Sequence, residues 1–506
     1  KSTLTDRQID TALTGLENIV TNPEMLESCA PLRSDNRDIW ANWIVIADTE
    51  MEAVLQPLVN HRNNTAGSAE FVSLDWIYSS YTGYDTQEQI RNFLKDAFYN
   101  HGLVYALIVG DYGETTRISS LKVGENTLNN VTDQYYADLD GSWDLDGDHL
   151  YGERSDGIDY CTDIYVGRFS SDVPGYVSTM VEKTIRYETE APAGLWRTTA
   201  ILPGAGLWPD SDYWGSFVCD SIANRIPESW VVRKLYETES WHPTNQIHFL
   251  NIGASYMAPQ GHGGSSGVYW YYNPPTDIIS NSNYTELDNI DKLCVFHSMA
   301  CMPGELTNIG CIAERLMIWP NGGAIAVMFN SSYGWGTPPS TGPSEWLEIR
   351  FAEQLFTYNQ NELGVAQAFA KDIVYFTPGV PLLDWVIQEN NFLGDPAVLF
   401  AAGQTGMENV GNLPSPPAQL HAIYPNPSSG GCILSWSLPE AGMYNLTVYD
   451  ILGREVLTLA DNLLPDDGTF FFDCRDDNGN ILPNGCYSVL LSTSDVSVRR
   501  QFVILR

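Results

Sequence analysis

Basic residues are scarce in this chain. Lysine and arginine together number 26 of 506 residues, against 63 aspartates and glutamates, and the formal net charge is −37 at pH 7. Binding to nucleic acid or to an anionic membrane surface depends on clustered lysine and arginine, so neither is expected as a partner. An excess of acid on this scale suits a soluble protein held outside a cell.

Long apolar runs are also missing. No run approaches the roughly 18 residues of a membrane span, so none is expected. Hydrophobic residues still make up 43% of the chain and aromatic residues 12%, which indicates that most of it folds. A chain of 506 residues is too long for a single core, and two or three domains are expected.

The cysteine count does not allow every cysteine to pair. There are nine, and one free nucleophile would leave eight, enough for up to four disulfides in an oxidising compartment. Cys474 and Cys486 flank a turn-rich stretch and are a plausible bridge. The alternative is that several cysteines are buried thiols, and spacing alone does not decide the pairing.

Most of the chain alternates apolar strands with amphipathic helices, the pattern of a largely parallel sheet covered by helices. The pattern restarts near Arg197, which predicts two subdomains at 39–196 and 197–402, after a polar N-terminal extension at 1–38. The clearest predicted elements are strands at 43–47, 103–109, 200–202, 252–257 and 293–296 and helices at 86–99, capped by Thr86, and 174–188.

The last part of the chain has a different periodicity. A proline-rich stretch at 413–417 lies within a predicted linker at 403–419, because proline cannot continue a helix. Apolar residues then recur every second position at 432–436, 444–449, 469–472 and 487–491, between glycine, proline and aspartate turns. Residues 420–506 are therefore predicted to form a small all-β, immunoglobulin-like sandwich.

A histidine and a cysteine each follow a predicted strand. His262 lies in the glycine-flanked stretch 261–264, and Cys301 lies beyond the strand at 293–296. The carboxyl ends of neighbouring strands in an open α/β sheet form its ligand-binding edge. There His262 could deprotonate Cys301 or hold it as a thiolate, and the thiolate would attack a carbonyl carbon. The amides of Gly263 and Cys301 could form an oxyanion hole.

Two alternatives accompany this pair. One is a glycine-rich turn with an unrelated buried cysteine. The other is that His297, four residues before Cys301, is the base. We expect His297 to face the core or to support the loop instead.

A second cluster of candidate residues is acidic. Carboxylates recur around two glycines, and calcium is coordinated by six to eight hard oxygens from a flexible loop of this kind. Position twelve of an EF-hand loop starting at Asp144 would be Ser155, so a complete EF-hand is absent. The alternative is a solvated acidic turn. The predicted ligands of a structural calcium ion are Asp138, Asp140, Asp144, Asp146, Asp148 and Glu153.

The histidine and cysteine motifs, with several others, resemble the gingipain family of cysteine endopeptidases, relatives of caspases, legumain and clostripain. The resemblance covers about residues 39–402. It implies a caspase-like α/β fold, protein or peptide substrates, His262 as general base, Cys301 as nucleophile, and Trp335 lining the pocket for the residue before the scissile bond. The further matching segments are 75–78, 89–93, 109–111, 165–168, 320–323, 332–336 and 393–396.

The chain departs from that family at one position. Gingipain-like sequences usually carry a carboxylate that orients the histidine, and the matching position here is Ala205. Asp210 and Asp212 lie near the position of the acid that recognises a basic side chain, and Asp212 is the predicted pocket acid. The alternative is that Ser216 and Phe217 match this position. A cysteine–histidine dyad can act without a third group. The alternatives are a catalytically silent peptidase fold acting as a surface binding or structural protein, and a calcium-dependent adhesin.

The C-terminal segments 424–427, 448–456 and 482–487 are similar, in that order, to the sorting domain of type IX secretion substrates. This resemblance covers about residues 420–506. It implies recognition by an outer-membrane secretion machinery, export through the periplasm and outer membrane, and a secreted or cell-surface bacterial protein. The alternative is an ordinary immunoglobulin-like accessory module.

Overall fold

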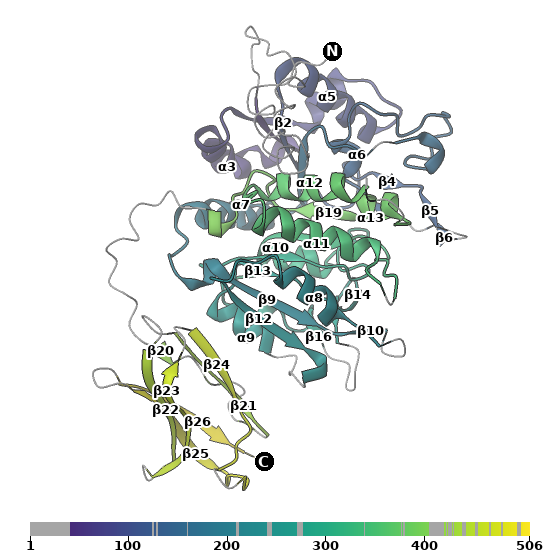
Figure 1. Cartoon of the computed structure of the whole chain (residues 1–506). Helices are drawn as coiled ribbons and strands as arrows, with labels where there is room; N and C mark the ends of the chain where they lie inside the picture. The colour runs from purple at the N-terminus through teal and green to yellow at the C-terminus, as the bar shows by residue number, and fades with distance from the viewer. Residues whose placement is uncertain are drawn as a thin grey trace, which may run out of the picture. The chain divides into compact units, whose positions relative to one another are not determined.

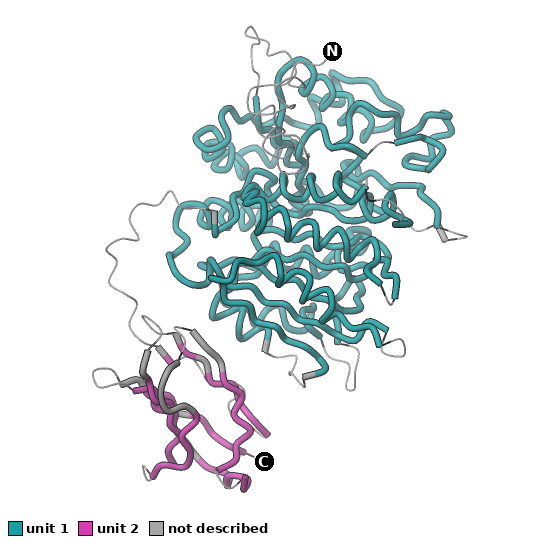
Figure 2. Tube along the Cα trace, viewed as in Figure 1, with its two compact units in different colours: residues 1–404 teal, residues 405–506 magenta. Residues whose placement is uncertain are grey.

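The structure is a computed structural model with two compact units, Lys1–Gln404 and Thr405–Arg506, shown separately coloured in Figure 2. The predicted extension, nearly all of the predicted linker and Asp210 lie outside the described residues. The described residues are 41–505 except 124–125, 128–129, 159, 209–211, 240–244, 271–276, 339, 376, 378–379, 404–418, 421–422, 424–427, 429, 438–441, 451–453, 465–466, 477–478 and 493–496.

A ten-stranded sheet runs through the first unit (Figure 1). Its pairs are parallel apart from the antiparallel pair β18–β19, as expected for a sheet built by helical crossovers. In spatial order its strands are β12 (Val231–Tyr236), β9 (Thr199–Gly204), β13 (Tyr256–Met257), β17 (Cys294–His297), β18 (Ala324–Asn330), β19 (Asn390–Leu393), β8 (Tyr165–Phe169), β3 (Tyr105–Val109), β1 (Trp43–Ala47) and β2 (Ala69–Ser73).

Helices pack beside this sheet in contacting groups. Helix α7 contacts α3 and α10, while α11 contacts α8, α12 and α13. Their apolar faces bury two large core clusters, one built mainly from residues before 165 and the other mainly from residues after 187. The helices are α3 (Glu52–Thr65), α4 (Leu74–Ser80), α5 (Thr86–His101), α6 (Gln134–Ala137), α7 (Pro174–Thr189), α8 (Gly215–Ala223), α9 (Asn245–Ile252), α10 (Ile312–Ile318), α11 (Pro343–Phe356), α12 (Leu363–Tyr375) and α13 (Leu383–Glu389).

Local sequence explains several element boundaries. Helix α5 begins after Asp85, whose side chain accepts from the Glu88 N–H at 2.8 Å, and ends at Gly102 with φ 75°. Asp85 is therefore the cap, and the prediction of Thr86 is wrong by one residue. The predicted strand from Ile252 is also wrong at its start. Ile252 ends α9, Gly253 turns the chain with φ 129°, and only Tyr256–Met257 is a strand.

The sheet continues across the boundary predicted between the two subdomains. Strand β19 pairs with β18 on one side and with β8 on the other, where Leu393 is opposite Arg168. A Cβ added to Gly167 would lie 2.3 Å from the Gly394 carbonyl oxygen, so only glycine permits this approach. The subdomain limits themselves stay a prediction.

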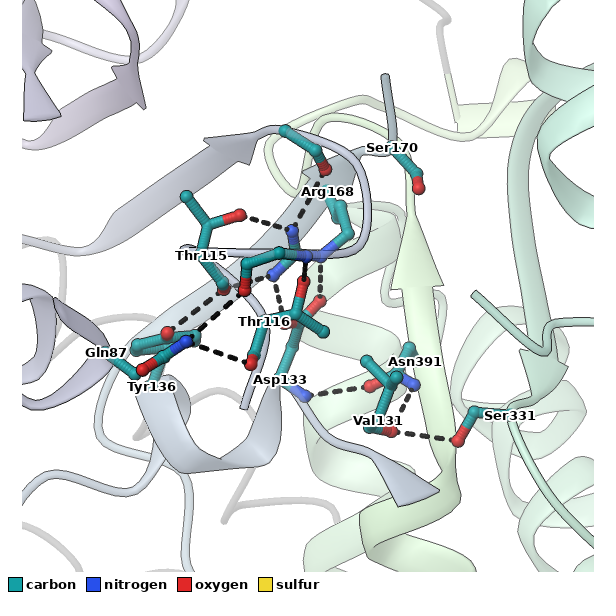
Figure 3. A network of polar contacts seen from close by, with 12 residues as sticks. Gln87, Thr115, Thr116, Val131, Asp133, Tyr136, Arg168, Ser170, Ser331 and Asn391 are labelled. Atoms are coloured by element: carbon teal, nitrogen blue, oxygen red, sulfur yellow. Dashed lines mark hydrogen bonds and ion pairs between the residues drawn. The ribbon is translucent and has the colours of Figure 1, made fainter. Parts of the chain in front are cut away.

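A buried polar network lies at this junction (Figure 3). Arg168 forms a bidentate ion pair with Asp133, with N–O distances of 2.8 and 2.6 Å. The Asp133 N–H donates to the Asn391 side chain, and both Asn391 Nδ2 and the Ser331 hydroxyl donate to the Val131 carbonyl. The network thus connects β8 with the residue that directly follows β18.

The second unit is a small sandwich of two antiparallel sheets around one core, which confirms the all-β prediction. The strands pair in the orders β20-β21-β24 and β23-β22-β25-β26. Cys474 is buried in this core, and the Cys486 side chain lies outside the described atoms, so the proposed bridge stays a prediction. The strands are β20 (Gln419–Leu420), β21 (Cys432–Ser437), β22 (Gly442–Asp450), β23 (Glu455–Leu464), β24 (Asp467–Phe472), β25 (Gly485–Ser492) and β26 (Ser497–Ile504).

Within the described parts of the chain, every helix is too short or too polar to cross a membrane.

Candidate active site

The strands that precede His262 and Cys301 are neighbours. Tyr256 of β13 pairs with Val295 of β17 in parallel, so the two strands end at the same edge of the sheet. The Ser298 hydroxyl then donates to the Pro259 carbonyl at 2.6 Å, which ties the two segments together beyond the strands.

His262 lies on a short strand rather than in the predicted loop. It begins β14 (His262–Gly264), which pairs with β15 (Gly267–Tyr269), itself paired with β16 (Asp277–Ser280). The Ser265 carbonyl in the β14–β15 turn accepts from the Ile312 N–H at 2.8 Å. The hairpin is therefore anchored to the segment that follows the cysteine.

Gly263 packs directly against the cysteine. A Cβ added to Gly263 would lie 2.7 Å from the Cys301 carbonyl oxygen and 2.9 Å from the Ala300 Cβ. Any larger residue here would push the hairpin away from Cys301. The structure thus brings the His262 and Cys301 segments into contact through glycine, although the residues are 39 positions apart in the sequence.

The His262 ring is held by a backbone carbonyl. Its Nε2 lies 2.7 Å from the Leu207 oxygen. Because a carbonyl only accepts hydrogen bonds, Nε2 carries the proton, and in the neutral ring Nδ1 carries the lone pair. Leu207 belongs to β10 (Gly206–Trp208), and the Trp208 ring packs edge-on to the imidazole with centroids 6.2 Å apart.

Cys301 is half-buried at the turn after β17. Its Sγ lies 3.7 Å from the Gly334 carbonyl oxygen. Burial, and then the charge of Glu389, raise the pKa of the thiol to about 11. In the resting protein Cys301 is therefore a neutral thiol near pH 7, which favours proton removal by a base during reaction over a stored thiolate.

The N–H of Cys301 lies where it can donate a hydrogen bond beside the thiol. Its neighbours are engaged, because the Ala300 N–H donates to the Ser298 hydroxyl at 3.2 Å and the Met302 N–H donates to the Ser332 carbonyl at 2.8 Å. The Cys301 N–H itself is directed at the Cys301 sulfur, where its hydrogen bond favours the thiolate. A donor beside the thiol is what an oxyanion hole needs.

His297 is not an accessible base. It is 1% exposed, and its ring packs edge-on to Phe351 with centroids 4.9 Å apart. Burial, with the nearby charge of Lys371, lowers the pKa of His297 to about 3. The His297 ring is therefore neutral and buried in the core, as expected from the sequence.

The acidic residues form two groups rather than one loop. Asp138 and Asp140 meet Asp163, and Asp144 and Asp146 meet Asp156, with carboxylate oxygens within 4.8 Å of one another in each group. Asp156 and Asp163 were not predicted as ligands, because Asp156 lies ten or more residues and Asp163 more than twenty residues from the other members of its group.

Two of the predicted metal ligands stand apart from these groups. Asp148 is exposed and accepts from the Leu150 N–H at 2.8 Å. Glu153 pairs with Lys122 at 3.3 Å and participates in the capping box of the following helical turn with Asp156.

Comparison with known proteins identifies the family. The model of peptidase family C25 matches residues 37–401, which is more than half of the chain. The chain belongs to peptidase family C25. A secretion system C-terminal sorting domain matches residues 422–505, and the protein is therefore a secreted or cell-surface protein of a bacterium.

Family C25 relatives of the chain include two gingipains from Porphyromonas gingivalis. Gingipain R2 is 25% identical over 374 residues, which covers 70% of this chain and 45% of the relative. Gingipain R1 is also 25% identical over 374 residues, with 34% of the relative covered. This chain thus spans less than half the length of the relatives it matches.

The crystal structure of the Arg-specific cysteine proteinase gingipain R superposes on this chain with a TM-score of 0.57 at 19% identity, covering 92% of this chain and 98% of the other. A complex of pro- and mature domains from Porphyromonas gingivalis gives a TM-score of 0.55 at 18% identity, covering 92% and 100%. These matches confirm the predicted α/β peptidase fold.

That Ala205 matches the position of the family's usual carboxylate stays a prediction, but the structure does show the surroundings of Ala205. It is fully buried, its N–H donates to the Gln260 carbonyl at 2.8 Å, and its carbonyl accepts from the Gly215 N–H at 2.7 Å. The nearby Leu207 carbonyl accepts from Nε2 of the His262 ring. No residue-type signal could reveal this acceptor, because every residue has a backbone carbonyl.

The two predicted pocket residues differ in their surroundings. Trp335 is half-buried, and its backbone N–H donates to the Ser344 hydroxyl at 2.8 Å. It directly follows Gly334, whose carbonyl contacts the thiol. Asp212 is exposed with φ 51°, and its carboxylate accepts from the Trp214 indole at 3.0 Å. Trp335 therefore adjoins the nucleophile, and Asp212 offers an accessible negative charge.

Proposed function

We propose that this member of a cysteine peptidase family is an active endopeptidase that uses a Cys301–His262 dyad. The observation that carries the proposal is the Leu207 hydrogen bond, which fixes the imidazole with its lone pair on Nδ1, in a hairpin packed on Cys301 through Gly263. The carbonyl orients the base, which a third acid would otherwise do.

The reaction proceeds in two steps. In the first, His262 takes the thiol proton as the Cys301 sulfur bonds to the peptide carbonyl carbon, and the oxyanion receives hydrogen bonds from the Gly263 and Cys301 amides. The carbon–nitrogen bond then breaks, and His262 returns the proton to the leaving amine. In the second, His262 activates a water that hydrolyses the thioester and restores the thiol.

Active-site labelling tests this proposal. A peptidyl acyloxymethyl ketone, which alkylates a catalytic thiol bound next to its base, should modify Cys301 far faster than any other cysteine of the full chain. His262→Ala should lower that rate by roughly 10²-fold or more, because the proton acceptor is lost. Equal labelling of all accessible cysteines would favour the alternative, a silent peptidase fold that serves as a surface binding or structural protein.

For specificity, we propose that Asp212 and Trp335 line the pocket for a basic residue before the scissile bond. The accessible Asp212 carboxylate supports a cationic partner, and one similar structure is described as Arg-specific. Asp212→Asn should then reduce kcat/KM for an arginine substrate by more than about tenfold relative to an isosteric citrulline substrate. An equal effect on both substrates would show that Asp212 does not recognise the basic side chain.

We also propose that calcium occupies the two carboxylate groups, where it stabilises the fold. Three aspartates converge in each, Asp138 is buried, and hard oxygens are the donors that calcium prefers. A bound cation would offset the mutual repulsion of the converging carboxylates. The proposed partners of the exported chain are protein or peptide substrates and, through residues 422–505, the outer-membrane secretion machinery.

A further inference from the structure

Asn330 is a buried residue at the carboxyl end of β18 that holds the two peptide groups before the nucleophile. Its Nδ2 donates to the Met299 carbonyl at 3.0 Å and to the Ala300 carbonyl at 3.2 Å. The side chain is 1% exposed. One amide therefore fixes two successive carbonyls of the turn that leads into Cys301.

The orientation of Asn330 is itself fixed by a chain of amides. Asn390, directly opposite in the β18–β19 pair, donates from Nδ2 to the Asn330 Oδ1 at 2.7 Å. Gln367 of α12 donates in turn to the Asn390 Oδ1. All three side chains are buried, and hydrogen bonds that point in one direction along such a chain strengthen one another.

Because Asn330 holds the Ala300 carbonyl, it also fixes the direction of the Cys301 N–H. The Ala300 carbonyl and the Cys301 N–H belong to one planar, trans peptide group, so they point in opposite directions. Holding the Ala300 oxygen on the Asn330 side directs the Cys301 N–H away from it. That N–H is a hydrogen-bond donor beside the Cys301 sulfur.

We propose that Asn330 is a positioning residue that aims the Cys301 N–H at the oxyanion formed during acyl transfer. This role rests on the proposed peptidase function. Loss of a single oxyanion donor typically lowers kcat by about 10²–10³-fold. A donor that is present but misdirected should cost less, about 10–100-fold, and should act on kcat rather than on KM.

The test is Asn330→Asp in the full chain, which keeps the side-chain size and the acceptor for Asn390 but removes the donors. The matched control is Asn289→Asp. Asn289 is also buried and clamps backbone carbonyls, those of Gly323 at 3.1 Å and Lys292 at 3.3 Å, but at the opposite end of β18.

Three readouts separate positioning from stability. Asn330→Asp should lower kcat about 10–100-fold with KM within about twofold. It should also lower the affinity for a peptide aldehyde by a similar factor. The adduct of the aldehyde with the thiol places an oxygen in the same oxyanion hole. Iodoacetamide alkylation of Cys301, which forms no oxyanion, should stay within about twofold of wild type. Asn289→Asp should change none of the three in folded protein.

Should Asn330→Asp fail to fold, Asn390→Ala serves as the second variant, because it releases the Asn330 amide to rotate and should shift kcat and aldehyde affinity in the same direction. Unchanged kcat and aldehyde affinity in a folded variant would overturn the positioning role. So would an alkylation rate that falls together with kcat. A wild-type chain that neither cleaves peptides nor binds the aldehyde would instead overturn the peptidase function on which this role rests.

Discussion

A backbone carbonyl holds the Nε2 side of the His262 imidazole. The Leu207 oxygen fixes the tautomer and the ring orientation, but it carries only a partial charge. It should therefore stabilise the imidazolium formed in the reaction less than an aspartate or glutamate would. The raised pKa of the Cys301 thiol agrees with this. A neutral thiol needs no imidazolium beside it before substrate binds.

The pH dependence of Cys301 alkylation follows from this neutral thiol. The pKa of the thiol is raised from 9.0 to about 11, so iodoacetamide labelling of the substrate-free protein should rise with pH until about pH 11. Only the thiolate reacts, so the rate tracks its fraction. Labelling can be followed by mass spectrometry with Cys301→Ala as the control. A plateau already reached at pH 7 would mean a preformed thiolate–imidazolium pair.

Sequence alone indicated His262 and Cys301 because glycine flanks and apolar runs mark strand ends, where a sheet gathers reactive side chains. It gave no sign of Leu207 or Asn330. A carbonyl acceptor has no residue type, and the Asn330 clamp depends on an antiparallel pairing of β18 with β19 that lies 60 residues further on. Asp156 and Asp163 were not predicted as metal ligands for a similar reason, since the fold rather than their spacing brings them to the other carboxylates.

At the level of secondary-structure elements, β19 and β8 join the two halves of the sheet around the buried Arg168–Asp133 pair. Periodicity predicted most strands, because each is a short apolar run. It could not predict their order, because pairings such as β19 with β8 connect residues far apart in the chain. The start of β13 was misjudged because the apolar residues of α9 and β13 follow one another with only Gly253–Ser255 between them.

Removing one partner of the buried ion pair should strongly destabilise this junction. Asp133→Ala leaves the Arg168 guanidinium buried and unpaired, which typically costs about 3–5 kcal/mol in the free energy of unfolding. Urea denaturation of the full chain measures this cost. The control is Asp291→Ala, which breaks the exposed Arg186–Asp291 pair and should cost less than about 1 kcal/mol. Equal losses in the two variants would contradict a special role for the junction.

Calcium should stabilise the loops that carry the two carboxylate groups. At a free concentration 100 times the Kd, one site adds about 2.7 kcal/mol to stability, so the Tm should rise with calcium and fall with a chelator. Asp156→Asn and Asp163→Asn should each reduce this response. Asp148→Asn, outside both groups, should leave it unchanged. If calorimetry shows the same Tm with calcium and with chelator, the two carboxylate groups do not bind a stabilising calcium ion.

At the level of the whole molecule, the chain joins a peptidase unit to a sorting domain and carries a net charge of −37. The domain order was readable from sequence because the periodicity changes from helical to alternating across a proline-rich stretch. A strongly acidic surface should also attract cationic substrates at low ionic strength, which agrees with a pocket for basic side chains.

The central claim is that this chain cleaves peptide bonds through Cys301. The most direct test is hydrolysis of a fluorogenic peptide library that varies the residue before the cleaved bond, with calcium and a mild reductant, by the full chain and by Cys301→Ala. Turnover is expected from the wild type, strongest after arginine or lysine, and none is expected from the variant. No turnover by a folded wild-type chain, or equal turnover by both, would contradict it.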